Sequence, residues 1–530
     1  MSSFLLSSFT GLSASAALTT ILATILIVSL WLIPREKLDP REPPLAHSKI
    51  PLIGHMINLL WHQNTYFTIL HKNQPSPITT LLILRQRIYI ISSPVLAQLA
   101  FRTSKTIDFE TIKQHASCKA IAFDQHGYDI VSGPLVPDPV IPNRMASYMS
   151  DLHTEMYGAL AQGPALYQTN KKILNKLVRG LNGVSGGWEG KLFEWLREVY
   201  TTSSAEALYG IENPVKWNPD FVQLVWDFEK DLGLLVLDKY PALTARKGHL
   251  ARSAVTPQFD KWYSQGLLTN ASGFVKGRAR CAQKWGFTQN EMAKAEISIL
   301  FAAVTNTVPN VFYMLCWIYS SPSLVEELRE EIKGIVRPGK GEKEMLLDIE
   351  GLREKCPLLT ACFHESLRLV KTGFSIRTVL EDTMLDTYLL KKGAIVQIPT
   401  GVMQADKATW GEDAEVFDPH RWLPGTDAFK SKDARKVQNA AFIPFGGGKN
   451  LCPGRHLAFN EIAAFVGAFV YGFDILGRDG GMINVPKMDV NKLGDGSTSP
   501  KGDTKVLMRS RKGFEGVEWG FAVGAEEEDG

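Results

Sequence analysis

Apolar residues recur along this 530-residue chain mostly at helical spacing, with a few short alternating stretches between them. A period of three to four residues predicts amphipathic helices, whereas alternation predicts strands. The alternating pattern predicts a hairpin of short strands over residues 82–91. Helices are predicted over residues 193–208, 221–235, 291–319, 324–335 and 457–471. We therefore expect a mainly α-helical protein with a small β component.

The N-terminus carries the longest uncharged apolar run, residues 13–33, and no charged side chain precedes Arg35. As a helix it would be ~31 Å long, about the hydrocarbon thickness of a bilayer. A cleaved signal peptide fits poorly, because a basic start is missing and the small residues 14–16 precede the apolar core. Arg35 and Lys37 follow the run, which favours a cytosolic catalytic domain. We expect a single-pass transmembrane anchor in the endoplasmic reticulum membrane.

The rest of the chain shows no repeat or low-complexity break. We expect an anchor over residues 1–34, a proline-rich linker over 35–50 and one large catalytic domain over 51–530. Hydrophobic residues make up 45% of the chain, enough for a substantial core. The net charge of +3 is too small to indicate nucleic-acid binding. The six cysteines lack paired spacing, which is typical of a reducing compartment.

One cysteine lies in an unusual setting. Gly446, Gly447 and Gly448 precede Cys452 and permit close approach of the backbone to a flat ligand. Pro453 suits the first position of a helix, which would place Cys452 near a helix N-terminus that favours a thiolate. The alternative is a buried, unreactive cysteine beside a glycine-rich turn.

This segment resembles the haem-binding loop of cytochromes P450, whose pattern is Phe-x-x-Gly-x-x-x-Cys-x-Gly. Phe445, Gly448, Cys452 and Gly454 stand at the required positions. The resemblance implies the cytochrome P450 fold and haem b with the Cys452 thiolate as axial iron ligand. It also implies that Phe445, Gly446, Gly448 and Asn450 contact the cofactor, although Asn450 stands where the family usually has arginine.

Two further motifs resemble the family. Glu365 and Arg368 form a Glu-x-x-Arg element three residues apart on one helix face. Alone, such a pair is usually a surface ion pair of ~0–1 kcal/mol. Arg421 lies in Phe-Asp-Pro-His-Arg-Trp, a segment similar to the family's third-arginine segment. The resemblance implies a structural Glu365–Arg368–Arg421 cluster on the proximal side of the haem.

An arginine that follows the Glu-x-x-Arg helix meets a haem propionate in this family, so the resemblance assigns that role to Arg377. A guanidinium matches a carboxylate bidentately. With Asn450 in place of arginine, the other propionate contact is weakened or passes to Lys449. Residues 145–180 lack the family's Trp-x-x-x-Arg, which leaves the second propionate partner open.

The stretch 297–309 resembles the family's distal helix, which crosses the haem face. Ala302 provides room for the cofactor, but Thr305 and Asn306 replace the usual acid and alcohol, and Thr307 follows. This variation is similar to the branch that contains sterol 7α-hydroxylases and prostacyclin synthase. Pro309 should kink the helix. Asn306, Thr305 and Thr307 are candidate catalytic residues; alternatively, Asn306 only solvates the kink.

The resemblance implies a monooxygenase that inserts one oxygen atom into an apolar, lipid-like or secondary-metabolite substrate, as in fungal tailoring enzymes. The chain has no Gly-x-Gly-x-x-Gly, so electrons should come from a separate NADPH–cytochrome P450 reductase. Two other functions stay open. One is a haem-dependent isomerase or dehydratase acting on a peroxide or other pre-oxidised substrate without a reductase, and the other is a non-catalytic haem sensor or carrier.

Overall fold

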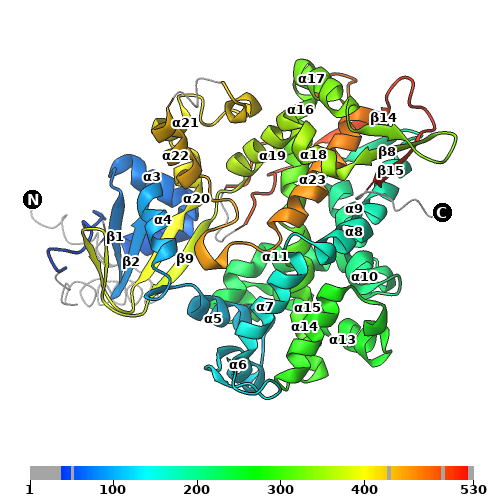
Figure 1. Ribbon diagram of the computed structural model, residues 1–530. Helices are drawn as coiled ribbons and strands as arrows, with labels where there is room; N and C mark the ends of the chain where they lie inside the picture. Colours follow the sequence, from blue (N-terminus) through cyan, green and yellow to red (C-terminus); the bar gives the residue numbers. More distant parts are fainter. Residues whose placement is uncertain (1–37, 49, 51–52, 426–430, 491–495, 523–530) are drawn as a thin grey trace, which may run out of the picture.

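The computed structural model describes residues 38–48, 50, 53–425, 431–490 and 496–522. It is mainly helical with small sheets, in agreement with the expected fold class (Figure 1). The expected anchor, residues 1–34, lies outside the described residues. Within them, one helical stretch, Gln289–Tyr319, is long and apolar enough to cross a membrane, but 72% of its apolar window is buried inside the protein. This stretch is therefore a core element.

The largest sheet lies at the left of Figure 1 and has the strand order β1-β2-β12-β9-β3. Strand β12 runs parallel to β2 and antiparallel to β9. Its strands are β1 (Ile78–Ile83), β2 (Gln86–Ile91), β3 (Ile107–Asp108), β9 (Phe374–Val379) and β12 (Ile395–Pro399). The smaller sheets contain β4 (Val136–Pro137), β5 (Met145–Ala146), β6 (Trp188–Lys191), β7 (Val336–Pro338), β8 (Glu344–Asp348), β10 (Thr383–Leu385), β11 (Tyr388–Leu390), β13 (Phe473–Gly477), β14 (Lys505–Ser510) and β15 (Glu518–Ala522).

Helices beside the large sheet and at the start of the helical region are α2 (Gly54–His62), α3 (Thr65–Asn73), α4 (Pro94–Arg102), α5 (Glu110–Ile121), α6 (Gln125–Ser132), α7 (Tyr148–Leu160) and α8 (Pro164–Gly183). Those that follow are α9 (Leu192–Tyr209), α10 (Pro214–Trp217), α11 (Phe221–Leu237), α12 (Pro241–Thr244), α13 (Arg246–Ser264) and α14 (Gly273–Lys284). The rest are α15 (Gln289–Val304), α16 (Thr307–Tyr319), α17 (Pro322–Lys333), α18 (Ile349–Lys355), α19 (Pro357–Val370), α20 (Thr400–Gln404), α21 (Lys407–Trp410), α22 (Lys432–Ala441) and α23 (Arg455–Gly472).

The core is continuous through the helical region. Helix α16 lies at its centre, since every side chain of this helix except Trp317 is buried. Helix α23 packs against α8, α16, α17 and α19 and is buried throughout residues 461–470. A second apolar cluster joins α4 and α22 to the large sheet. The segment between α22 and α23 thus runs from the sheet region into the helical core, shown in orange in Figure 1.

Part of the expected linker lies against the large sheet. Ala46 N–H donates to the Thr80 carbonyl, and Thr80 N–H donates to the Pro44 carbonyl, both at 2.8 Å. The buried Glu42 carboxylate accepts bonds from Arg87 at 3.0 Å and from the Tyr89 hydroxyl at 2.8 Å. Residues 42–46 are therefore fixed to the edge of the catalytic domain.

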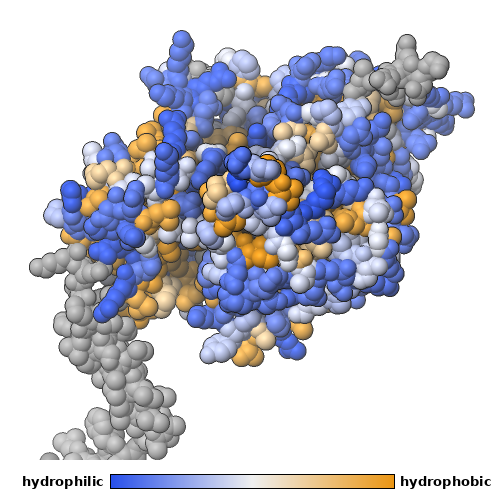
Figure 2. Space-filling model, turned by 60° about the horizontal axis from the view of Figure 1, so that its bottom comes forward, coloured by the Kyte–Doolittle hydropathy of each residue, from blue (hydrophilic) through white to orange (hydrophobic). Residues whose placement is uncertain are grey.

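Apolar side chains also reach the surface. Figure 2 shows them in several patches separated by polar residues. The most exposed large ones are Leu243 at 82%, Tyr240 at 79% and Trp61 at 78%. They belong to α12, the turn before it and α2.

Candidate active site

The segment that connects α22 to α23 forms a tight loop around Cys452. Gly446 and Gly448 have φ values of +76° and +67°, which L side chains rarely adopt. The turn brings the Cys452 N–H to the Phe445 carbonyl at 3.0 Å. Arg455 Nη1 donates to the Cys452 carbonyl at 3.1 Å. Both backbone groups of Cys452 are thus held within the loop.

The glycines also let this loop approach α4. A Cβ on Gly447 would lie 2.2 Å from the Phe101 ring, and one on Gly448 would lie 2.5 Å from the Phe101 carbonyl oxygen. A larger residue at position 447 would displace the Phe101 ring, and one at position 448 would displace the backbone of α4. The loop is therefore shaped by its fit against the sheet region as well as by its own turn.

Helix α23 begins two residues after Pro453, the residue that suits the first helical position in the sequence. Its N-cap is Gly454 and its first residue is Arg455, so Pro453 precedes the helix and Cys452 lies two residues before the cap. The reason is local, since Pro453 and Gly454 form a turn directly after the bond from the Cys452 N–H to Phe445, and the first helical bond, from the Ala458 N–H, goes to the Gly454 carbonyl. The helix end is near Cys452, but the cysteine does not cap it.

Cys452 differs from the other five cysteines in exposure. Those five are buried, whereas Cys452 is half-buried. Burial raises the pKa of the Cys118 thiol to about 11 and those of Cys281 and Cys356 to about 12. A thiol must be deprotonated to bind a metal, so these buried cysteines are poor candidates. Cys452 is the one of the six cysteines that is not fully buried.

The structure brings Glu365, Arg368 and Arg421 together in a buried cluster. Arg368 donates to both Glu365 carboxylate oxygens, at 2.8 Å and 2.7 Å. Arg421 Nε donates to Glu365 Oε1 at 2.9 Å. Glu365 is fully buried, and the two arginines are 1% and 5% exposed. This is a satisfied internal network, unlike a surface ion pair.

Sequence reasoning missed two members of this cluster. Trp422 Nε1 donates to Glu365 Oε2 at 2.9 Å, and Asp413 accepts a bond from Arg421 at 3.0 Å. Trp422 directly follows Arg421 in the sequence, which was the only available signal. Arg368 also donates to the carbonyls of Gln404 and Ala414. The cluster therefore fixes the whole segment from α20 to Trp422 against α19.

Arg377 lies on β9 and is 4% exposed. Its guanidinium carbon lies 5.0 Å from the centre of the Phe101 ring and 4.9 Å from that of Phe109. Phe101 thus contacts both this arginine and the Cys452 loop. Lys449 is half-exposed, 4.0 Å from Asp108, and Asn450 ends the short 3-10 turn Gly448–Asn450.

The helix expected over residues 291–319 is interrupted close to Pro309. Helix α15 ends at Val304, α16 begins at Thr307, and Thr305 and Asn306 form the turn between them. Pro309 explains the position, because a proline removes the bond to the carbonyl four residues earlier and its ring clashes there. That carbonyl belongs to Thr305. The expected single helix over 291–319 is therefore two helices.

Asn306 connects this break to the C-terminal part of the chain. Its Oδ1 accepts a bond from the Ser497 N–H at 2.9 Å. Asn310 Nδ2 donates to the Asn306 carbonyl at 2.7 Å and to Ser497 Oγ at 3.0 Å. Among the residues that the structure describes, the Asn306 amide nitrogen has no hydrogen-bond partner. The amide oxygen of Asn306 therefore holds the structure together, whereas its amide nitrogen can donate to a ligand or a water molecule.

The hydroxyls of the neighbouring Thr305 and Thr307 each bond to a backbone carbonyl four residues earlier in the chain. Thr305 Oγ1 donates to the Phe301 carbonyl at 2.9 Å, and Thr307 Oγ1 donates to the Ala303 carbonyl at 3.1 Å. Both threonines are buried. Ala302 is exposed although it lies close to the buried end of α15, so one face of this helix borders accessible space.

Comparison with known proteins decides the family. The family model for cytochrome P450 matches residues 271–493. A cytochrome P450 monooxygenase of Hypoxylon pulicicidum, nodJ, is 31% identical over 496 residues, which cover 92% of this chain and 94% of that protein. This chain belongs to the cytochrome P450 family. The predicted resemblance is confirmed, and the chain is an enzyme of the P450 monooxygenase class.

Other relatives of this P450 extend over nearly the same length. A cytochrome P450 monooxygenase of Gibberella zeae is 29% identical over 501 residues, 92% of each chain. Prostacyclin synthase of Rattus norvegicus is 24% identical over 504 residues, 89% of this chain and 94% of that protein. The family is haem-thiolate, with iron bound through a cysteine.

The residues of this P450 fit such a cofactor. The Cys452 thiol is accessible, and glycines keep side chains away from the loop backbone around it. A buried arginine, Arg377, lies on β9 against Phe101, which also contacts the Cys452 loop, and it offers positive charge for propionates. The exposed Ala302 leaves the distal helix face without a bulky side chain. The donor set therefore suits a flat, anionic iron complex.

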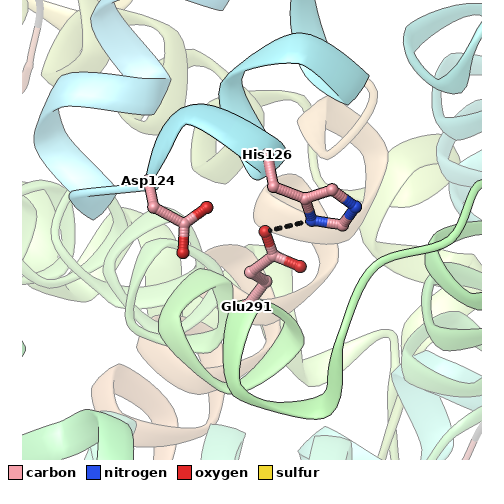
Figure 3. A group of neighbouring side chains, drawn as sticks. All are labelled: Asp124, His126 and Glu291. Carbon is pink, nitrogen blue, oxygen red and sulfur yellow. Dashed lines mark hydrogen bonds and ion pairs between the residues drawn. The ribbon is translucent and has the colours of Figure 1, made fainter.

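A second group of possible ligands, Asp124, His126 and Glu291, joins α6 to the start of α15 (Figure 3). Each of the three already has protein partners. Glu291 Oε1 bonds to His126 Nδ1 at 2.8 Å, and its Oε2 accepts from the Thr288 N–H and hydroxyl as a capping box. Asp124 caps α6 by accepting from the Gly127 N–H. We interpret the group as a connection between two helices.

Proposed function

We propose that this P450 is a membrane-anchored haem-thiolate monooxygenase that inserts one oxygen atom from O2 into an apolar small molecule. The observation that carries the proposal is the Cys452 loop, in which the accessible cysteine is held beside a glycine-shaped turn. The buried Glu365 cluster supports it, because it fixes the neighbouring segment rigidly.

In this proposal, Cys452 is the axial iron ligand and Arg377 binds a haem propionate. Glu365, Arg368 and Arg421 are structural. Thiolate-ligated haem iron supplies oxygen activation by favouring O–O cleavage. The remaining cofactor contacts come from Phe445, Gly446, Gly448, Asn450 and Ala302.

Proton delivery is assigned to the turn between α15 and α16. The oxygen of the Asn306 side-chain amide accepts a bond from the Ser497 N–H. The amide nitrogen has no partner among the described residues, so it can donate to a water molecule. An amide is a poor proton relay by itself because its donor and acceptor atoms are separate. The Thr305 and Thr307 hydroxyls donate to the helix, which leaves their lone pairs able to accept from such a water.

The partner, location and substrate class are further parts of the proposal. We expect electrons from an NADPH–cytochrome P450 reductase on the same membrane and a cytosolic catalytic domain on the endoplasmic reticulum. The apolar run over residues 13–33 supports the anchor. The exposed Trp61, Tyr240 and Leu243 support additional contact with the membrane. We propose a lipid-like or secondary-metabolite substrate.

The ligand is tested by the spectrum of the reduced carbon monoxide complex. The intact protein should show the strongly red-shifted Soret band of thiolate-bound haem, and Cys452→Ser should lose it. Cys118→Ser is the matched control, because it removes a buried thiol elsewhere and should keep the band. A histidine-type spectrum in the intact protein would contradict the assignment.

The reaction type is tested with labelled dioxygen, the reductase and NADPH. A monooxygenase places one labelled oxygen atom in the product. Turnover of a peroxide substrate without NADPH or dioxygen would instead indicate the isomerase function.

A further inference from the structure

A tyrosine on α7 reaches the loop that carries the proposed iron ligand. The Tyr157 hydroxyl donates to the Leu451 carbonyl, and a second, longer contact of 3.4 Å reaches the Lys449 carbonyl. Tyr157 and Leu451 are 294 residues apart in sequence. Burial, and then the nearby charge of Cys452, raise the pKa of the Tyr157 hydroxyl, so it remains a proton donor.

The Leu451 carbonyl belongs to the peptide group whose nitrogen is that of Cys452. The N–H end of this same peptide donates to the Phe445 carbonyl at 3.0 Å. Tyr157 therefore holds one end of the peptide plane and Phe445 holds the other. With both ends fixed, the plane cannot rotate, and the direction in which the Cys452 side chain leaves the backbone is set.

Tyr157 is itself well supported. His153, one turn earlier on α7, stacks on its ring with the centroids 4.0 Å apart and the planes 23° apart. At the start of α7, Asp151 accepts bonds from Lys284 at 2.7 Å and from the Trp285 ring nitrogen at 2.9 Å. Helix α7 is thus fixed to α14, and its tyrosine is presented to the loop at a defined position.

We infer that Tyr157 is a positioning residue for the Cys452 ligand, which holds the 451–452 peptide and through it tunes the electron donation of the sulfur. A donor on the carbonyl polarises the peptide and makes its N–H end more positive. This N–H donates to the Phe445 carbonyl, but it belongs to Cys452 itself, so its added positive charge lies close to the sulfur and favours a negative charge there. The inference rests on the proposed role of Cys452.

The test compares the haem-loaded wild type with Tyr157→Phe, which keeps the ring and the stack on His153 and removes only the hydroxyl. We expect a more negative midpoint potential of the iron, because a less stabilised thiolate donates more strongly. We also expect the reduced carbon monoxide complex of this variant to show a larger fraction of the thiol form than the wild type at the same pH.

Tyr319→Phe is the matched control. Its hydroxyl also donates to backbone carbonyls, those of Phe469 at 3.2 Å and Phe473 at 2.8 Å, but at the far end of α23. This variant should lose some stability and keep the potential of the wild type. A potential and thiolate fraction unchanged in Tyr157→Phe would overturn the inference.

If Tyr157→Phe fails to accumulate as folded protein, 3,5-difluorotyrosine at position 157 replaces it. Fluorination makes the hydroxyl a stronger donor without changing the shape of the ring substantially, so the potential should move in the positive direction. No movement would overturn the inference. A wild type that lacks the thiolate band would remove the proposed function and this inference together, whereas an unaffected Tyr157 variant removes only the inference.

Discussion

At the scale of single residues, Glu365 accepts more hydrogen bonds than any other carboxylate that the structure describes. It accepts side-chain bonds from two arginines and a tryptophan, and its Oε1 also accepts from the Asp418 N–H at 3.2 Å. A buried ion cluster adds little net stability over an apolar core, but removal of one partner leaves uncompensated charge. The effect of losing Glu365 should therefore be large.

Glu365→Gln keeps the shape of the side chain and removes its charge. We expect the free energy of unfolding, measured in urea, to fall by roughly 3–5 kcal/mol. We also expect the purified variant to retain less haem than the wild type. Glu326→Gln is the control, because Glu326 pairs with Arg329 at the surface with its side chain 71% exposed. That change should cost ~0–1 kcal/mol. Equal midpoints for the two variants would contradict a structural role of the cluster.

Asn306 gives the second prediction at this scale. Asn306→Ala should lower product formed per NADPH and raise peroxide release, because the proposed water loses its donor. Asn306→Asp is the informative partner, since it keeps the acceptor for the Ser497 N–H and loses the amide nitrogen. Wild-type coupling in Asn306→Asp but not in Asn306→Ala would show that the side chain only holds Ser497.

The spacing of Glu365 and Arg368 predicted that these two can pair, and the resemblance to the family's motifs predicted that Arg421 joins them. The sequence could not predict Asp413, or the contact of Tyr157 with Leu451, because neither belongs to a motif and the second joins positions 294 residues apart. Such contacts depend on how α7 packs against the Cys452 loop. Only the folded chain specifies that arrangement.

At the scale of elements, apolar periodicity located helices closely. The predicted 193–208 is Leu192–Tyr209, 221–235 is Phe221–Leu237, and 457–471 is Arg455–Gly472. The hairpin begins four residues earlier than predicted, at Ile78, because Thr79 and Thr80 are buried strand residues that break the alternation. Polar residues inside a buried strand interrupt the alternation of apolar and polar positions, so the pattern does not reveal where the strand begins.

The connection between α6 and α15 should respond to pH. The hydrogen bond that His126 donates to the Glu291 carboxylate is the main cause that raises the pKa of His126, and the negative charge of Glu291 is the next. The stabilisation is therefore complete below the unfolded value of ~6.5 and is lost as pH rises through the higher folded pKa. We expect hydrogen exchange in α6, corrected for intrinsic rates, to become faster over that range.

Two variants isolate this effect. His126→Gln should make the opening of α6 independent of pH over that range. His115→Gln is the matched control, because His115 also contacts α6 but through the Tyr128 hydroxyl at 3.5 Å, and it should leave the pH dependence in place. The charges around the pair, Asp124, Asp129 and Lys294, are unchanged in both variants. Exchange that is independent of pH in the wild type would refute the prediction.

At the scale of the whole molecule, the proposed anchor can be separated from the catalytic domain. The full chain should resist carbonate extraction from membranes, while a chain that begins at Leu38 should be largely released. That start keeps Glu42 and its bonds to Arg87 and Tyr89, so the domain edge stays intact. Some residual binding is expected from Trp61, Tyr240 and Leu243. Complete solubility of the full chain would argue against the anchor.

The difference in exposure between Cys452 and the other five cysteines has a practical consequence. All six lie in the described part of the chain, and a maleimide probe can reach only Cys452 without unfolding. Once iron occupies this sulfur, the probe has no target. Native protein should therefore take up about one label per molecule when haem-free and almost none when fully loaded. The extent of labelling, followed by mass spectrometry, therefore measures the haem occupancy of any preparation without the use of haem absorbance.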